Sequence, residues 1–447
     1  MLRSHHGISQ PASTLEGGLL ILGWADSWAA TLTYGIAHLG KSLFWYTSEI
    51  LFAFFLTEFV GLPIDRMGVV LAIGFVISAA IDLGVGAGLA ARLTTARSAS
   101  RIQFIGSIIC SASLIAVFLG ARMPVELRYG YAIMTGIAFR LGFAAYDIPQ
   151  NTLMVLATSD AANRRRIASV RIWFSGTATL IVAATVGPLI ARRYQANGAS
   201  FLLMVAILFA ILAIGSAWLL ARLFRDPQLG HPPKIAAIRI LPLGHGIAAF
   251  WLLLLVMAAT SIFTPAFAKL EPYFATYTLR SAWWGGAVVT LMAAGIVVGQ
   301  PIWIYMLARM SAGLVMLLNA LLKLAGLGAF WVVGPSYPVA AAAAAFVFGL
   351  GNGGVGVVQW ASFSEAVARF DPSRTGLSYG LFGATGKVSL AIGGILLATA
   401  LDGADGGDLT LLMAVIPAIG ALVCALAGIG LVVIEDADKR AMRVLLR

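Results

Sequence analysis

Ionisable side chains stand inside long apolar stretches of this chain, and these are the residues whose chemistry needs an explanation. Asp82, Asp147, Arg171 and Lys387 each lie among residues apolar enough to cross a membrane. A charge at the centre of a membrane helix costs about 2.5 to 3.5 kcal/mol on insertion scales, so such residues usually face a cavity or a partner. A carboxylate accepts hydrogen bonds and a guanidinium donates them in a planar fork, which suits hydroxyl-rich solutes. We therefore expect these residues to contact a solute or an ion.

Arg140 and Asp147 are seven residues apart, which returns both to one helix face about two turns apart. This stripe could line a solute-binding cavity. Alternatively, Asp147 neutralises Arg140 or Arg171 as a fixed pair between helices. A second alternative is that Arg171 is an ordinary basic residue at a helix end, because three arginines at 164–166 stand just before it.

Asp82 is the charged residue of an otherwise uncharged apolar span and is followed by glycines at 84, 86 and 88. A hard cation such as Na⁺ prefers several oxygen ligands, whereas a proton needs a single acid. We therefore favour proton coupling over sodium coupling at Asp82. A salt bridge from Asp82 to Lys41 or Lys387 is the third alternative.

His38, Ser42 and Glu49 fall at spacings of four and seven, again on one helix face. Histidine titrates near neutral pH when water reaches it, and Glu49 is a further protonatable group. We predict a proton site on this stripe. The alternative is that His38 is an interior residue and Glu49 points to an exit vestibule.

The composition is that of a helical membrane protein. Hydrophobic residues make up 60% of the 447 positions, only 11% are charged, and the mean hydropathy is +0.92. Soluble domains contain about 45 to 50% apolar residues. An outer-membrane barrel would show alternating strands of about 10 residues instead of continuous apolar runs. The net charge of +11 is spread over short connections, which argues against a nucleic-acid-binding patch.

Apolar runs between turn and charge signals predict twelve membrane-spanning helices, all α. They start near residues 30, 68, 102, 127, 166, 200, 242, 283, 311, 337, 375 and 409. We predict an N-terminal tail and helix approach at 1–29, a six-helix bundle at 30–223, a linker at 224–241, a second six-helix bundle at 242–434 and a tail at 435–447. Most basic residues fall on the side of both termini, which the positive-inside rule makes cytoplasmic; a smaller group that includes Lys269 falls on the other side.

Short segments of the first half recur in the second half at nearly one offset. Phe55-Leu56-Thr57 recurs as Phe274-Ala275-Thr276, and segments 67–70 and 89–92 recur near 285–289 and 306–309, about 217 to 219 residues later. The alternative is that apolar segments resemble one another through composition alone. Duplicated six-helix bundles are the architecture of the major facilitator transporters, in which a central cavity opens alternately to either face.

An ordered series of motifs from about Tyr34 to Leu396 carries a family resemblance. It comprises Tyr34-Gly35, Gly40-Lys41, Thr57-Glu58-Phe59-Val60-Gly61-Leu62, Asp82, Tyr146-Asp147-Ile148-Pro149, Arg171 and Gly386-Lys387. In these motifs the chain resembles the glycoside-pentoside-hexuronide:cation symporters, the melibiose-permease branch of the major facilitators. Three positions depart from the family pattern. That family usually has a carboxylate where this chain has Gly86, an aspartate in place of Ser42 and a tryptophan in place of Asn151.

The resemblance implies a secondary active symporter that binds its solute between two halves. The implied solute-binding residues are Asp147, Arg171, Lys41, Asn151, Lys387 and Ser42. A cation is implied near Asp82, and Glu49 and His38 are the further coupling residues that we predict.

Together these observations predict a transporter and not an enzyme. We expect a cation-coupled symporter, with H⁺ favoured over Na⁺, for a small polar organic solute such as a sugar, glycoside or sugar acid. A lysolipid or another amphiphile is the alternative cargo, because animal relatives of the resembled family move lysolipids. We expect no cofactor, metal ion or nucleic acid. The expected partners are the solute, the coupling cation and the bilayer, around a monomer in a bacterial inner membrane.

Two further motifs predict packing. Gly349-x-Gly351-x-x-Gly354 formally matches a dinucleotide-binding fingerprint, but no strand precedes it, so close helix packing is favoured. The aromatic residues Tyr273, Tyr277, Trp283 and Trp284 predict an interfacial belt.

Overall fold

The protein is described here by a computed structural model. It describes residues 28–88, 95–156, 161–192, 197–224, 244–370, 375–402 and 408–445. Most of the predicted linker at 224–241, most of the predicted tail at 1–29 and the repeat segment 89–92 lie outside these ranges. The side chain of Asp82 also lies outside the described part of the chain.

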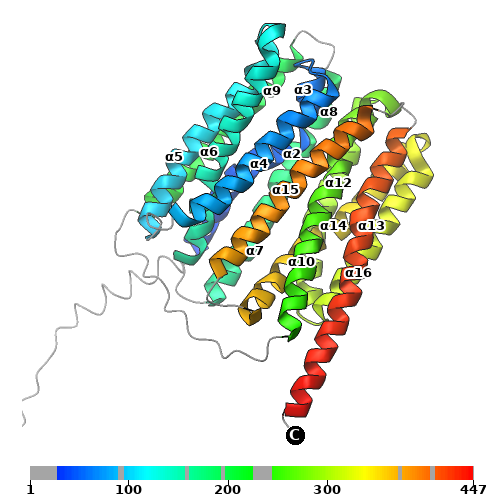
Figure 1. Cartoon of the computed structure of the whole chain (residues 1–447). Coiled ribbons are helices and arrows are strands. Elements are labelled where there is room, and N and C mark those ends of the chain that lie inside the picture. Colours follow the sequence, from blue (N-terminus) through cyan, green and yellow to red (C-terminus); the bar gives the residue numbers. More distant parts are fainter. Residues whose placement is uncertain are drawn as a thin grey trace, which may run out of the picture.

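Twelve α-helices of 20 residues or more account for most of the described residues, as the sequence predicts (Figure 1). They are α2 (Trp28–Ile50), α4 (Ile64–Gly88), α5 (Ala96–Leu119), α6 (Arg128–Leu156), α7 (Ala161–Ala184), α9 (Gly198–Leu223), α10 (Gly244–Phe263), α12 (Ala282–Leu307), α13 (Ala312–Val333), α14 (Pro338–Phe370), α15 (Thr375–Asp402) and α16 (Asp408–Leu445). Several begin earlier than predicted, including α5, which starts at a capping box of Thr95 and Ser98. The helix α16 continues past the predicted boundary at 434.

The helices form two groups of six, which we call the N-terminal half (α2 to α9) and the C-terminal half (α10 to α16) (Figure 1). Within the halves, α5 packs on α6 and α9, and α12 packs on α14. Between the halves, α4 packs along α15 and α7 packs along α12. The predicted twofold-duplicated, all-α architecture is therefore confirmed.

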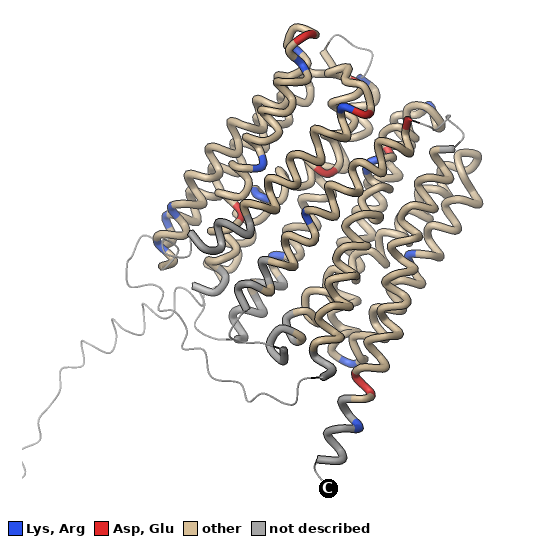
Figure 2. The backbone as a smooth tube through the Cα atoms, viewed as in Figure 1, with Lys and Arg blue, Asp and Glu red and all other residues tan. Residues whose placement is uncertain are grey.

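Ten of the helical runs in the described residues are long and apolar enough to cross a membrane. The long helices missing from that set are α2 and α6, whose polar residues include Lys41, Glu49, Arg140 and Asp147. Figure 2 shows charged positions within the body of the helices as well as at their ends. These two helices thus carry much of the predicted site, which also draws on α4, α7 and α15.

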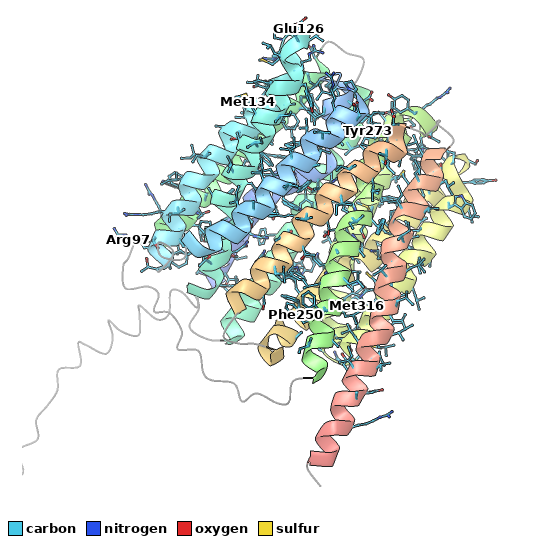
Figure 3. All side chains as sticks on the ribbon, viewed as in Figure 1. Arg97, Glu126, Met134, Phe250, Tyr273 and Met316 are labelled. Atoms are coloured by element: carbon cyan, nitrogen blue, oxygen red, sulfur yellow. The ribbon has the colours of Figure 1, made fainter. Side chains whose placement is uncertain are left out.

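Large apolar side chains cover the outer surface of the bundle, as lipid contact requires. Met134, Ile211 and Val433 are each more than half exposed. Figure 3 shows Met134 on the outer face of α6, with Glu126 and Tyr273 at one end of the molecule and Arg97 toward the other. We call the end with Glu126 and Tyr273 the distal end, because the chain terminus in view lies opposite it.

The first helix of each half is broken near the distal end. In the N-terminal half α2 is followed by the short helix α3 (Phe52–Glu58), and in the C-terminal half α10 is followed by α11 (Ala266–Tyr273) and a π-helix (Phe274–Leu279). Thr57 and Thr276 of the recurring triplet lie in these corresponding short segments. The recurrence therefore marks structurally equivalent places.

Two sequence predictions for α11 are wrong. Lys269 does not lie in an exposed connection but is 4% exposed inside the bundle. Tyr273 does not belong to an interfacial belt, since it is 1% exposed and its hydroxyl lies 2.8 Å from that of Thr57. The apolar run of the sequence ends near Pro265, but the helical path continues through α11 to the distal end.

The glycine motif of α14 serves helix packing, as predicted. A Cβ at Gly349 would overlap the carbonyl of Met292 in α12, and one at Gly351 would meet Asn319 and Lys323 in α13. Glycine lets these backbones approach more closely than any other residue allows.

Replacing Gly349 with alanine should therefore destabilise the protein by about 1 to 3 kcal/mol, the usual cost of overpacking. Gly356→Ala is the matched control, because Gly356 lies in the same helix with nothing within 4 Å of its Cβ position. That change should leave stability unchanged or raise it. Melting temperatures in one detergent would compare the two variants, and equal values would contradict the packing role of Gly349.

Candidate functional site

Lys41 and Asp147 form a salt bridge between α2 and α6. Nζ of Lys41 lies 2.6 Å from Oδ1 of Asp147 and donates a hydrogen bond of 3.1 Å to Oδ1 of Asn151. The Lys41 side chain is 4% exposed and that of Asp147 is 25% exposed. The carboxylate therefore keeps a face open while the ammonium is enclosed. We predicted all three residues as solute contacts, but the sequence did not indicate that Lys41 pairs with Asp147.

Specific contacts hold α2 and α6 at this register. The Tyr34 hydroxyl donates to the carbonyl of Gln150 at 2.9 Å, one turn from Asp147. Pro149 lacks an N–H and leaves the Ala145 carbonyl without its helical donor. Gly106 of α5 packs directly on that carbonyl, where a Cβ would clash. The Asp-Ile-Pro sequence thus fixes both the carboxylate and a close helix contact behind it.

Two more cations approach Asp147 from other helices. Arg171 of α7 and Lys387 of α15 both lie close enough for their charges to act on Asp147. Gly35 of α2 allows α7 to approach, because a Cβ there would overlap Phe174. The group combines three cations with one carboxylate. It draws on both halves, since Lys387 belongs to the C-terminal half. We call Lys41, Asp147, Asn151, Arg171 and Lys387 the central cluster.

Other predicted residues lie beside the central cluster. Ser42 and His38 are both 4% exposed on α2, and the His38 ring stacks on that of Tyr34. His38 Nδ1 and both polar atoms of the Gln150 side chain have no hydrogen-bond partner among the described residues. Sequence reasoning missed Gln150, because an uncharged amide gives no signal in a polar helix.

Glu49 lies in a second group of charges farther along the same helices. Its Oε2 is 3.2 Å from Nζ of Lys269, and its Oε1 is 3.7 Å from Nη2 of Arg140. Neither contact meets hydrogen-bond geometry, so both are ion pairs only. The Arg140 guanidinium also stacks 3.9 Å above the Phe75 ring. Arg140 therefore pairs with Glu49 and not with Asp147. Glu49 lies eight residues, or about 12 Å, along α2 from Lys41. We call Glu49, Arg140 and Lys269 the distal cluster.

Further contacts join the halves between the distal cluster and the distal end. The Tyr273 hydroxyl lies 2.8 Å from that of Thr57, and the Tyr277 hydroxyl donates to Glu58 at 2.9 Å. Gly286 of α12 packs against Gly187 of the short helix α8 (Val186–Ala191). Closer to the central cluster, Trp45 packs against Phe75 of α4, which forms an apolar group with Leu390 of α15. The two halves are thus joined on the distal side of the central cluster.

A cavity of about 780 Å³ opens at the boundary of the halves near the distal end. It is lined by α7, α8 and α12, mainly by small and apolar residues, with Arg192 and Trp283 among them. It does not contain the residues of the central cluster. Its apolar lining suits a hydrocarbon chain better than a sugar.

Two half-bundles with charged residues held between them define a membrane transporter of the major facilitator type. Solved structures of other proteins share the fold. One is from work on proton-dependent oligopeptide transporters, with a TM-score of 0.65 at 14% identity over 93% of this chain and 100% of that chain. Another is a bacterial homologue of the iron transporter ferroportin, with a TM-score of 0.60 at 11% identity over 91% of this chain and 99% of that one.

The family model described as MFS/sugar transport protein matches residues 33–431, and the chain belongs to this family. It is also 22% identical over 163 residues to an uncharacterized symporter, YjmB, of Bacillus subtilis strain 168. That match spans 36% of each chain. The protein is therefore a multi-pass membrane protein and a secondary transporter.

Glu49→Gln should destabilise the closed structure strongly, because it leaves Lys269 and Arg140 buried without a counter-charge. Breaking a buried ion pair on one side costs about 3 to 5 kcal/mol. Glu58→Gln is the matched control, since Glu58 is partly exposed and pairs with a tyrosine hydroxyl; a loss of about 1 kcal/mol or less is expected there. Thermal unfolding in detergent measures both, and equal losses would refute the bridging role of Glu49.

Proposed function

We propose that this protein is a proton-coupled symporter of a small hydroxyl-bearing solute that carries a carboxylate, such as a sugar acid. The observation that supports this solute class most directly is the central cluster. Its three cations, Lys41, Arg171 and Lys387, act on one carboxylate, Asp147. The positive charge that these described residues bring together favours an anionic group, while Asp147 and Asn151 offer acceptors to solute hydroxyls.

An arginine suits this role because its planar guanidinium binds a carboxylate through two parallel hydrogen bonds. Among the described residues Arg171 has no ion pair or hydrogen bond, which supports its availability to a solute carboxylate. Lys41, in contrast, is already held by Asp147 and Asn151. In this proposal Arg171 and Lys387 bind the solute carboxylate, and Asp147 accepts hydrogen bonds from its hydroxyls.

Proton coupling is the part of the proposal that concerns energy supply. The resemblance to cation symporters and the partial match to a symporter support a coupling cation. We favour H⁺ because a single acid suffices to carry a proton, whereas Na⁺ prefers several oxygen ligands. A sugar-acid anion moving with one proton is electrically neutral, so the pH gradient alone would drive its accumulation.

A second candidate function is transport of a lysolipid or a similar amphiphile. The apolar cavity beside α7, α8 and α12 supports it, because an acyl chain would fit there with the headgroup phosphate near Arg192. It is the weaker candidate, because this cavity lacks the residues of the central cluster.

Asp147→Asn should abolish solute uptake while the protein still inserts in the membrane. Asparagine keeps the size of the side chain but removes the charge that pairs with Lys41. Asp65→Asn is the control, because Asp65 is an exposed carboxylate at the start of α4. Wild-type uptake by Asp147→Asn would remove Asp147 from the solute site.

The solute class is tested with purified protein in liposomes under an imposed pH gradient. Radiolabelled D-glucuronate should accumulate, and neutral D-glucose should not. Replacing the pH gradient with a sodium gradient should stop accumulation. Uptake of lysophosphatidylcholine without uptake of glucuronate would favour the second candidate, and uptake driven by sodium alone would overturn proton coupling.

A further inference from the structure

Glu271 of α11 is a carboxylate that neither cluster includes. It is 0% exposed, and neither Oε1 nor Oε2 has a hydrogen-bond partner among the described residues. Its side chain points to α12, where a Cβ at Gly285 would lie 3.1 Å from Oε1. The sequence analysis did not single it out, because it adjoins Pro272 and the residues assigned to an aromatic belt.

The charged and titratable groups around α11 are bonded to other partners. Lys269, two residues before Glu271, forms an ion pair with Glu49 of α2. On α3, Glu58 accepts a hydrogen bond from Tyr277 of the π-helix. The hydroxyl of Tyr273, in α11 itself, shares a hydrogen bond with the hydroxyl of Thr57.

The remaining elements packed on α11 bring no described ion pair to Glu271 either. In α12 the titratable side chain is Tyr305, at the opposite end of that helix. In α16 the first residue is the acid Asp408, whose side chain is not described. The Glu271 carboxyl group thus has no described cation within ion-pair distance, unlike Asp147 and Glu49.

An ionised carboxylate without a partner is costly to bury, and such a group takes up a proton instead. Asp147 and Glu49 each have cationic neighbours that stabilise the charged form. Glu271 differs from both, because no described residue supplies a counter-charge to its ionised form. For this reason a change in hydration at Glu271 would bind or release a proton.

Glu271 is followed directly by an irregular stretch of helix. Pro272 cannot donate a helical hydrogen bond. The π-helix of residues 274–279 comes next and ends at Arg280, which has a left-handed backbone with φ of 50°. Single π-helical turns are rare and often mark functional sites. The contacts that join the halves at the distal end, from Tyr273 and Tyr277, arise from this same stretch.

We infer that Glu271 is the binding site of the coupling proton. It takes up the proton when the distal end is open to water and retains it when the Tyr273–Thr57 and Tyr277–Glu58 contacts form. This inference rests on the proposed proton-coupled function and replaces Asp82, Glu49 and His38 as the primary proton site.

Proton binding is tested first without any solute. Infrared spectra of the purified protein, recorded as a function of pH, resolve the C=O stretching band of a protonated buried carboxylic acid from carboxylate bands. The wild type should keep such a band at neutral pH, and Glu271→Gln should lose it. Glu126→Gln, which changes an exposed carboxylate, should retain it. An unchanged band in Glu271→Gln would overturn the inference.

Transport supplies the second test, with D-glucuronate as the probe. A pH difference of about one unit supports about a tenfold accumulation for one proton per solute. Glu271→Gln should reduce that ratio to about one while labelled glucuronate still exchanges against unlabelled glucuronate at near wild-type rate. Accumulation at the wild-type ratio would contradict the assignment. Glu271→Asp, which restores an acid, should recover part of the accumulation and shows that loss in the glutamine variant is not a folding defect.

The two tests separate the inference from the function on which it rests. If wild-type protein fails to move glucuronate but Glu271→Gln loses the infrared band, the proposed solute is wrong and the proton site stands. If transport is proton-driven and the band persists in the variant, the proton site is wrong and the function stands.

Discussion

The closed end of this transporter depends on contacts between the first helices of its two halves. Glu49 and Lys269 are paired across the halves, as are Thr57 with Tyr273 and Glu58 with Tyr277. The last two pairs are 216 and 219 residues apart, close to the repeat offset. Halves related by an axis along the membrane normal bring equivalent positions together only beside that axis. The buried charge pair must be complete, because either partner alone would be expensive to bury.

Two helices of the N-terminal half, α2 and α6, carry residues of both charged clusters. On α2, Lys41 belongs to the central cluster and Glu49 to the distal one; on α6, Asp147 and Arg140 divide in the same way. A helix transmits displacement along its length, so a solute that draws Asp147 away from Lys41 also acts on the contacts of Glu49. This arrangement links occupation of the central cluster to closure at the distal end through two rods that span both.

Much of the fold could be predicted from the sequence, because apolar runs and their interruptions report helices directly. The charged residues within those runs were also identifiable, since each stands out against an apolar background. Their partners were not. Spacing places Arg140 and Asp147 on one face, but the rotation of α2 and α11 decides that Arg140 meets Glu49 and that Lys41 meets Asp147. Lys269 was placed wrongly and Glu271 was overlooked, because Pro265 and Pro272 interrupt the apolar pattern while the helical path continues.

The opposite charges of Glu49 and Lys269 have a consequence for the origin of the chain. In a symmetric pair of identical bundles, a position beside the twofold axis faces its own copy, and a charge there would meet a like charge. The repeat offset matches Glu49 with residues 266–268 and Lys269 with residues 50–52, none of which is charged, so the two copies differ at this contact. Such a contact fits a fused chain whose halves have diverged, and it makes one half unable to replace the other.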